Sequence, residues 1–365
     1  MSAAWIRRTV LPPAAAFLLQ RALLAAVAWA HGFDPFAAET WSRWDSTYYL
    51  QIASSGYLPL EHCRPETHYP ADAWCGNAAW FPGYSWLVAA VAHPLGLSPA
   101  NAAVWISALA QLACLILVWV TLDDARRWPA LALAAFFPGN VYMAAVFPVS
   151  LCALALLCCI RLSWSGMFKR AALAAAAAAA CYPTGVLLAP VVGLWALLHR
   201  RWRATWVVAG ALGGLAAVVL VMRLQTGAWD AFALVQAKYA YSGNLLDSLG
   251  ARLKPLVNPR YRDEKGFVTG LQTLLSAVMV LLLASQELRR RWPERSSLVA
   301  LCMGTFWMTP LMLGGRLSLY RSDALLLPAV LLFPALPRKV QLAFVGAAFA
   351  LSFPMAAMFF RAVLV

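Results

Sequence analysis

The residues best able to perform chemistry lie close together near the N-terminus, in the run Trp-Ser-Arg-Trp-Asp-Ser-Thr-Tyr-Tyr. Its single carboxylate, Asp45, can take a proton from a hydroxyl group as a general base. A neighbouring guanidinium can bind an anion, and aromatic rings can stack on a ligand. We therefore predict that Asp45 is catalytic and that four neighbours bind substrate: Arg43, Trp44, Tyr48 and Tyr49.

These residue types also have purely structural interpretations. Asp45 and Arg43 could pair with each other at a membrane interface. Tryptophan and tyrosine are enriched where transmembrane helices meet water, so the rings could form only an aromatic belt. Asp34 and Glu39 precede the motif and could either assist Asp45 or lie in a solvated loop.

The composition indicates which elements must position this motif. The chain has 365 residues, of which 62% are hydrophobic and 12% charged. Because ~20 apolar residues cross a bilayer as one helix, we predict an all-α polytopic membrane protein with about 9–11 transmembrane helices. We expect residues 1–365 to form a single transmembrane domain. The segments without Asp, Glu, Lys or Arg are 73–122, 128–160, 171–198, 204–222, 269–286, 296–315 and 340–360.

The basic residues predict the orientation of the chain. The net charge is +14, and the basic clusters lie in short segments between apolar runs, as in cytoplasmic loops. The N-terminus is then cytoplasmic, the first span covers about residues 9–30, and residues 31–81 form an extracytoplasmic catalytic loop. Scattered basic residues form no soluble patch, so we do not expect nucleic acid as a partner. The clusters are Arg7–Arg8, 199–203, 289–291 and 338–339.

The middle of the chain does not give a consistent topology. An odd number of crossings is needed between residues 82 and 199, yet six apolar pieces occur there. One piece must be re-entrant or continuous with its neighbour. The pieces are 83–97, 100–122, 129–145, 148–163, 170–181 and 183–198, and the later spans are 204–223, 269–286, 297–314, 324–337 and 340–361. Gly210, Gly213 and Gly214 predict close helix packing rather than a nucleotide-binding loop.

Two of the eight cysteines differ from the others. Cys63 and Cys75 bracket a polar segment of the predicted outer loop, where disulfides are permitted, so we predict a bond between them. That loop carries His68, a possible substrate ligand or an ordinary surface residue. No Cys-x-x-Cys pair occurs, which disfavours a zinc site. We predict no firm cofactor and leave a divalent metal open.

Several motifs resemble one family of membrane enzymes. Ser-Arg-Trp-Asp at 42–45, Ile-Ala-x-x-Gly-Tyr at 52–57, Glu61 and Phe-Pro-Gly at 81–83 resemble the second mannosyltransferase of glycosylphosphatidylinositol assembly, the PIG-V family, and its bacterial relatives. The similarity is best over residues 36–90, patchy to residue 200 and faint beyond, where 137–145 and the Arg and Pro pattern of 315–334 are weaker matches.

The resemblance implies a GT-C glycosyltransferase. Such an enzyme would move a sugar, here mannose, from a polyprenyl-phosphate donor to a lipid-linked or glycan acceptor, with inversion at the anomeric centre. It implies Asp45 as the base. Arg can bind the leaving phosphate as a planar fork, although Arg316 and Arg321 could also be interfacial anchors. The further substrate-binding predictions are Glu61, His68, Arg316 and Arg321.

The resemblance also implies a place in the cell, and other classes of protein remain. We expect an integral protein of a bacterial cytoplasmic membrane, surrounded by membrane lipids, with its active site facing outward; a eukaryotic version would lie in the ER membrane. A transporter or flippase would show ionisable residues within spans and repeated halves. A non-catalytic assembly subunit, or a GT-C transferase of a non-mannose sugar, is also compatible with the motif.

Overall fold

The computed structural model describes residues 3–64, 69–70, 72–122, 127–239, 244–313 and 319–364. Two predicted site residues, His68 and Arg316, lie outside these ranges. Within them the chain is almost entirely helical, with one two-stranded sheet. The first elements are α1 (Ala3–Thr9), α2 (Leu11–Ala30), η1 (Ala38–Trp41), α3 (Ser46–Ser55), β1 (Glu61–His62), β2 (Trp74–Cys75), α4 (Gly83–Leu95), α5 (Pro99–Thr121), α6 (Arg127–Ala135), α7 (Asn140–Ala144) and α8 (Val149–Trp164).

The second half of the chain continues in the same way, with short 3-10 helices between longer α-helices. Its elements are α9 (Phe168–Cys181), η2 (Pro183–Leu187), α10 (Leu188–Leu198), η3 (Trp202–Ala204), α11 (Thr205–Thr226), α12 (Ala231–Ala237), α13 (Leu245–Val257), η4 (Pro259–Tyr261), α14 (Glu264–Arg289), α15 (Glu294–Met312), α16 (Leu319–Ser322), η5 (Asp323–Ala335) and α17 (Arg338–Phe360).

Local sequence signals set the ends of the long helices. Ser98 accepts a hydrogen bond from the Asn101 amide (3.2 Å) and Pro99 opens α5, so a hydroxyl cap and a proline fix its start. The Asp263 carboxylate likewise accepts from the Gly266 amide (2.8 Å) at the start of α14. Polar caps therefore mark where these apolar helices begin.

In the described part of the chain, five helices are long and apolar enough to cross a membrane: α2, α5, α11 with its preceding turn, α14 and α17. They coincide with five predicted spans, and the protein is an all-α polytopic membrane protein, as predicted. Val149–Trp164 and Pro183–Leu198 are shorter apolar helices. The expected total of about 9–11 crossings stays a prediction.

Two predicted spans differ from continuous α-helices. The piece at 129–145 divides into α6 and α7, because Pro138 cannot donate a backbone hydrogen bond and Gly139 adopts φ +81°. Residues 136–150 of this broken region are all buried. The piece at 324–337 is the 3-10 helix η5, which contains Pro328 and Pro334. Both irregular segments lie in the core, where they can approach the site.

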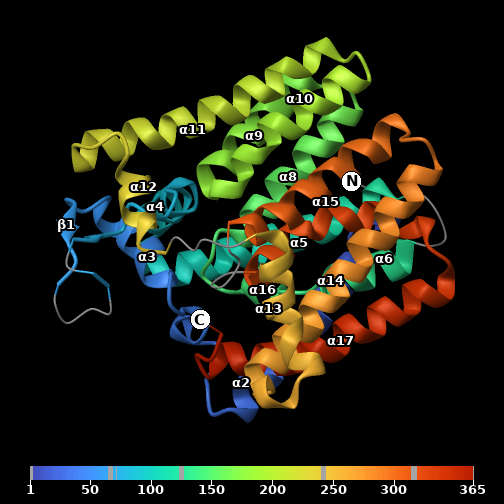
Figure 1. The fold of residues 1–365 in the computed structure, drawn as a ribbon, viewed down its shortest axis with the longest axis horizontal. Helices are drawn as coiled ribbons and strands as arrows, with labels where there is room; N and C mark the ends of the chain where they lie inside the picture. The colour runs from blue at the N-terminus through green and yellow to red at the C-terminus, as the bar shows by residue number, and fades with distance from the viewer. Residues whose placement is uncertain are drawn as a thin grey trace.

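The helices are arranged with α9, α10 and α11 on one side and α2 and α17 on the opposite side, with α5, α8 and α15 between them (Figure 1). Helix α11 packs directly on α9. A Cβ at Gly210 would lie 2.2 Å from the Ala172 carbonyl oxygen, and one at Gly214 would lie 2.4 Å from that of Ala176. The predicted close packing is present at these two glycines, whereas the space beside Gly213 is open.

The first loop gathers with elements distant in sequence at one edge of the molecule. Helices α3, α4 and α12 and strand β1 lie together there (Figure 1). Helix α3 packs on α4, and α12 contacts β2. This edge joins the predicted catalytic motif to a segment about residue 235.

Candidate active site

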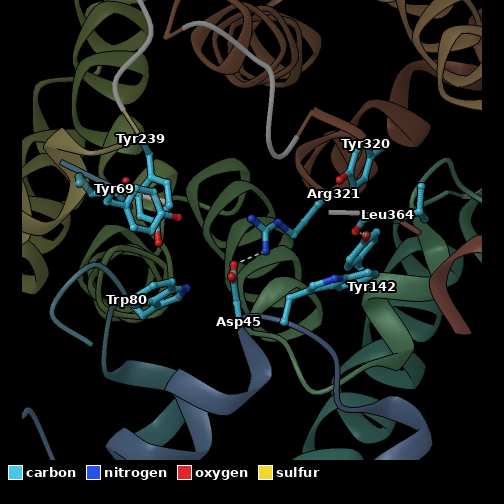
Figure 2. Close-up of a pocket in the computed structure, with 10 residues that line it drawn as sticks. Asp45, Tyr69, Trp80, Tyr142, Tyr239, Tyr320, Arg321 and Leu364 are labelled. Atoms are coloured by element: carbon cyan, nitrogen blue, oxygen red, sulfur yellow. Dashed lines mark hydrogen bonds and ion pairs between the residues drawn. The ribbon is translucent and has the colours of Figure 1, made fainter. Parts of the chain in front are cut away.

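Asp45 immediately precedes α3, with its carboxylate free of the helix. An aspartate at this position ordinarily accepts a hydrogen bond from a first-turn amide. Asp45 instead has helical dihedral angles and makes no side-chain cap bond. The preceding residue, Trp44, has φ 45°, a conformation that is uncommon for a bulky side chain. The chain therefore turns sharply before Asp45, and the carboxylate points into a pocket (Figure 2).

Hydrogen bonds fasten this turn to the buried segment after α7. Ser46 Oγ accepts from the Arg43 amide (3.0 Å) and donates to the Val146 carbonyl (3.0 Å). The Val146 amide donates to the Trp41 carbonyl (3.0 Å). The Trp44 ring packs edge-on against Phe359, with centroids 5.5 Å apart. Contacts on both sides thus hold Asp45 at the mouth of the helix bundle.

The partner of Asp45 is Arg321, on the short helix α16. Arg321 Nη1 donates to Asp45 Oδ2 and forms an ion pair with it (Figure 2). The Arg321 and Asp45 side chains are 15% and 22% exposed, so the pair is largely shielded from water. Burial disfavours the charge on Arg321 and is the largest single influence, but Asp45 and the neighbouring tyrosines Tyr182, Tyr142 and Tyr49 together raise the pKa of the guanidinium. Arg321 also lies over the Phe147 ring, 5.5 Å from its centroid.

The ion pair lies in a cavity of about 280 Å³. Tyr69, Trp80 and Tyr239 form one side, Tyr142, Tyr320 and Leu364 lie on the other, and the ion pair lies between them (Figure 2). Most of the wall is aromatic, which suits a ligand that has both polar groups and apolar faces. The lining residues are Trp44, Asp45, Tyr69, Trp80, Tyr142, Gln236, Tyr239, Tyr320, Arg321 and Leu364.

Stacking and cation–π contacts order the Tyr69 side of the pocket. Trp80 stacks on Tyr48, with ring centroids 3.7 Å apart. Tyr69 and Tyr239 meet edge to face at 5.7 Å. Lys238 Nζ lies 5.0 Å from the Tyr69 centroid and 5.2 Å from that of Tyr239, and burial lowers the pKa of Lys238. These rings therefore form a rigid wall from two separate loops.

A disulfide bond supports this wall. Cys63 and Cys75 are bonded across the ends of β1 and β2, whose antiparallel pairing sets Glu61 opposite Cys75. Lys238 Nζ lies 3.3 Å from Cys75 Sγ and so connects the disulfide to the segment after α12. The bond closes the loop that carries Tyr69, which restricts where that ring can lie.

The predicted residues of the first loop have different positions. Trp44 and Asp45 line the pocket, and Arg321 joins them from the far end of the chain. Tyr48 is not among the lining residues, but its ring stacks on that of Trp80, which is. Tyr49 is buried beneath, edge-on to Tyr84 and Phe147.

Arg43 and Glu61 are not brought to the pocket. The Arg43 guanidinium donates to the carbonyl oxygens of Glu39 (2.7 Å), Ser42 (2.9 Å) and Phe360 (3.3 Å). It thus ties the loop to the end of α17, and the alternative Asp45–Arg43 pair is replaced by Asp45–Arg321. Glu61 is exposed on β1. The turn before Asp45 sends two side chains that are neighbours in sequence in different directions.

Seven lining residues were not predicted from sequence. Trp80 precedes the Phe-Pro-Gly motif, and Tyr142 lies within the weaker match at 137–145, so proximity to these motifs was an available signal. Tyr69, Tyr239 and Tyr320 lie in polar or interfacial segments, where single aromatic residues are common. Gln236 and Leu364 carry no local signal; Gln236 is positioned by donating to the Ala79 carbonyl (3.2 Å).

The described residues of the pocket do not fit a divalent metal. Among the described lining residues Asp45 is the only carboxylate, and Arg321 occupies one of its oxygens. Throughout the described part of the chain, no three His, Cys, Asp or Glu side chains gather as metal ligands. We therefore derive no step through a metal.

Comparison with known proteins identifies a shared fold. No family model matches the chain, and no curated protein matches it. It is similar to the oligosaccharyltransferase of Archaeoglobus fulgidus in the apo form, with a TM-score of 0.55 and 12% identity over 95% of this chain and 56% of that one. For the same enzyme with Zn and sulfate, the TM-score is 0.53 and the identity 12%, over 94% of this chain and 53% of that one. For the A. fulgidus oligosaccharyltransferase AglB in complex with an inhibitory peptide and a dolichol-phosphate, the TM-score is 0.51 and the identity 11%, over 97% of this chain and 56% of that one.

These similarities define the class of fold. The chain spans just over half the length of each solved structure, and nearly all of its own length is matched. The chain therefore has the fold of the matched part of these oligosaccharyltransferase structures. It is an integral membrane protein of this fold, with an ion-paired carboxylate in an aromatic pocket.

Proposed function

We propose that the protein is a membrane glycosyltransferase that moves a sugar from a polyprenyl-phosphate donor to a hydroxyl group of a lipid-linked or glycan acceptor. The observation that carries this proposal is the Asp45–Arg321 ion pair in a mostly aromatic pocket. A carboxylate, a guanidinium and stacking surfaces are the groups such a transfer needs. The shared fold supports it, because a solved protein of this fold binds dolichol-phosphate, a polyprenyl phosphate.

The proposed transfer is a single displacement. The acceptor oxygen forms a bond to the anomeric carbon while the bond between that carbon and the phosphate oxygen breaks. The acceptor proton passes to the Asp45 carboxylate, and the lipid phosphate leaves with the bonding electrons. Attack opposite the leaving group inverts the anomeric centre. Asp45 acts as general base, a role for which a carboxylate beside the reacting hydroxyl is suited.

In this scheme the Arg321 guanidinium can bind either of two anions, the Asp45 carboxylate or the donor phosphate. It pairs with Asp45, so the guanidinium occupies one oxygen of the proposed base. A donor phosphate offers the guanidinium a bidentate partner. Binding of the donor would then draw Arg321 away from Asp45 and free the carboxylate for the acceptor. Arg321 thereby serves both as phosphate ligand and as control of the base.

The aromatic side of the pocket would hold a sugar ring. Trp80 presents a flat surface that is backed by Tyr48, with Tyr69 and Tyr239 alongside. Stacking on such rings is one use of the aromatic wall, and its placement beside Asp45 favours this use over a simple interfacial belt. We place this side of the protein, with residues 31–81, outside the cytoplasmic membrane, on the basis of the basic loops.

The proposal of mannose as the sugar, and the resemblance to the PIG-V family, rest on the sequence motifs around Asp45. A bacterial cytoplasmic membrane is the expected location, for the same reason. The pocket geometry is equally suited to other hexoses, so the donor must be identified by experiment.

The test is a transfer assay with the purified protein in lipid nanodiscs. Polyprenyl-phosphate mannose, glucose, arabinose and an amino sugar would be supplied in turn, with a native lipid extract as acceptor. We expect one labelled lipid or glycan product, formed from the mannose donor and absent with Asp45→Asn. Product of the same anomeric configuration as the donor would contradict the single displacement. Absence of transfer from every donor, with folded protein, would contradict the glycosyltransferase itself.

A further inference from the structure

A buried carboxylate lies two residues after Arg321 and takes no part in the proposed chemistry. Asp323, the first residue of η5, is only 2% exposed. Its Oδ2 accepts hydrogen bonds from Gln272 Nε2 (3.0 Å) and Ser276 Oγ (2.9 Å). Burying a carboxylate costs free energy unless hydrogen-bond donors compensate it. The two donors therefore stabilise Asp323 in this buried position.

Both donors belong to one face of α14. Gln272 and Ser276 are four residues apart and so lie one above the other on the helix. Gln272 Nε2 also donates to the carbonyl oxygen of Tyr320 (2.9 Å). One amide group therefore binds the chain on both sides of Arg321: the carbonyl before it and the carboxylate after it.

The same turn also rests on the broken segment between α6 and α7. A Cβ at Gly139 would lie 2.6 Å from the Tyr320 carbonyl oxygen and 3.2 Å from Ala324 Cβ. Only glycine permits this approach, and its φ of +81° is a conformation that other residues rarely adopt. The backbone of residues 320–324 is thus held by contacts with both α14 and Gly139, which together form a clamp.

We propose that Asp323 and Gln272 are positioning residues that fix the backbone of Arg321, so that its guanidinium reaches both Asp45 and the donor phosphate. The proposal rests on the proposed function for its phosphate partner but not for the clamp itself. If the backbone of Arg321 were not held, it could shift when the guanidinium changed partners. With the backbone fixed, only the side chain has to move between Asp45 and the donor phosphate.

The structural test does not depend on activity. Structures of variants in nanodiscs would be determined by cryo-electron microscopy at side-chain resolution. We expect Gln272→Leu, which removes both hydrogen bonds of Nε2, and Asp323→Ala, which removes their acceptor, to move Arg321 out of contact with Asp45. The matched control is Gln341→Leu: Gln341 is equally buried and donates to the Leu336 carbonyl (2.7 Å), next to the other end of η5. Arg321 in its original place in both test variants would overturn the proposal.

Ser276→Ala provides a milder variant in case Gln272→Leu does not fold. It removes one of the two donors to Asp323 and leaves the Tyr320 contact. We expect a smaller displacement of Arg321 in the same direction. An unchanged Arg321 in both Ser276→Ala and Asp323→Ala would count against the clamp.

The kinetic test asks whether the effect passes through Arg321. We expect Gln272→Leu to lower kcat/KM for the donor by roughly 10- to 100-fold, since displacements of ~1 Å cost about that much. In an Arg321→Ala background the same change should cost little more, because contacting groups on one path are not additive. Equal losses in both backgrounds would indicate a merely structural role.

The two proposals fail differently. If the wild-type protein transfers no sugar and binds no polyprenyl phosphate, the proposed function is wrong, while the position of Arg321 in the variant structures still decides the clamp. If transfer occurs but Gln272→Leu and Gln341→Leu are equally active, the positioning role is wrong and the function stands.

Discussion

Arg321 and Asp45 are 276 positions apart in the chain and form an ion pair in the pocket. The pair combines the predicted base with a predicted phosphate ligand, and each group balances the charge of the other. A charge that is buried and loses its partner is costly, so neither group can be changed without consequence for the other. The arrangement predicts ordered binding, with the lipid phosphate engaging Arg321 before Asp45 can accept a proton.

Asp45→Asn should abolish most of the transfer activity. The change keeps the size of the side chain and removes the proton acceptor, so we expect at least ~100-fold lower kcat with folded, membrane-inserted protein. Asp34→Asn is the matched control in the same loop, because Asp34 is exposed and its oxygen can still accept from the Phe36 amide (2.9 Å). Near-normal turnover by Asp45→Asn would remove this residue from the catalytic role.

Arg321→Ala should cut turnover strongly and raise the donor KM, whereas Arg321→Lys should restore activity only in part. An ammonium group can neutralise the phosphate but lacks the planar fork that binds two oxygens at once. Donor kinetics and polyprenyl-phosphate binding would measure both effects. Arg316→Ala is the comparison, and a smaller loss is expected there; equal, mild losses at Arg316 and Arg321 would mean that neither binds the phosphate.

Loss of the Cys63–Cys75 bond should affect acceptor use more than folding. The bond restrains the loop of Tyr69, whereas the helices carry most of the stability. We expect Cys75→Ser to raise the acceptor KM with little change in the apparent melting temperature. Cys158→Ser, which alters a free and partly buried cysteine, is the control. Non-reducing peptide mapping should recover one linked fragment, and two free thiols in protein from an oxidising compartment would end this idea.

Gly139→Ala should destabilise the protein and impair transfer together. The added Cβ would lie 2.6 Å from the Tyr320 carbonyl, and the positive φ adds backbone strain of about 1–3 kcal/mol. We expect a lower apparent melting temperature and a reduced kcat/KM. Gly304→Ala, within α15, meets open space and should be neutral or stabilising, since alanine favours helix. Identical behaviour of the two variants would show that the Gly139 contact does not hold the Arg321 turn.

Much of the helical framework was predictable because it is encoded locally. The spans at 9–30, 100–122, 204–223, 269–286 and 340–361 correspond to long helices, since an apolar run of that length can form only a helix in a bilayer. The structure of the broken segment at 129–145 was harder to predict from the sequence. Pro138 and Gly139 marked an interruption, but whether the chain would cross, turn back or stay buried depended on packing against η5 and α17.

The sequence by itself determined the class of the protein and singled out Asp45 as the candidate base, because hydropathy and a short motif are properties of neighbouring residues. Only the tertiary structure decided which residues share the pocket. Arg43, two residues before Asp45, turns away to the end of α17, while Arg321 arrives from the far end of the chain and Tyr239 from another loop. The physical reason is that side-chain direction depends on backbone turns such as that at Trp44, and long-range proximity depends on how helices pack. Neither is set by local residue type, so the sequence could single out Asp45 as a candidate but could not predict that it pairs with Arg321.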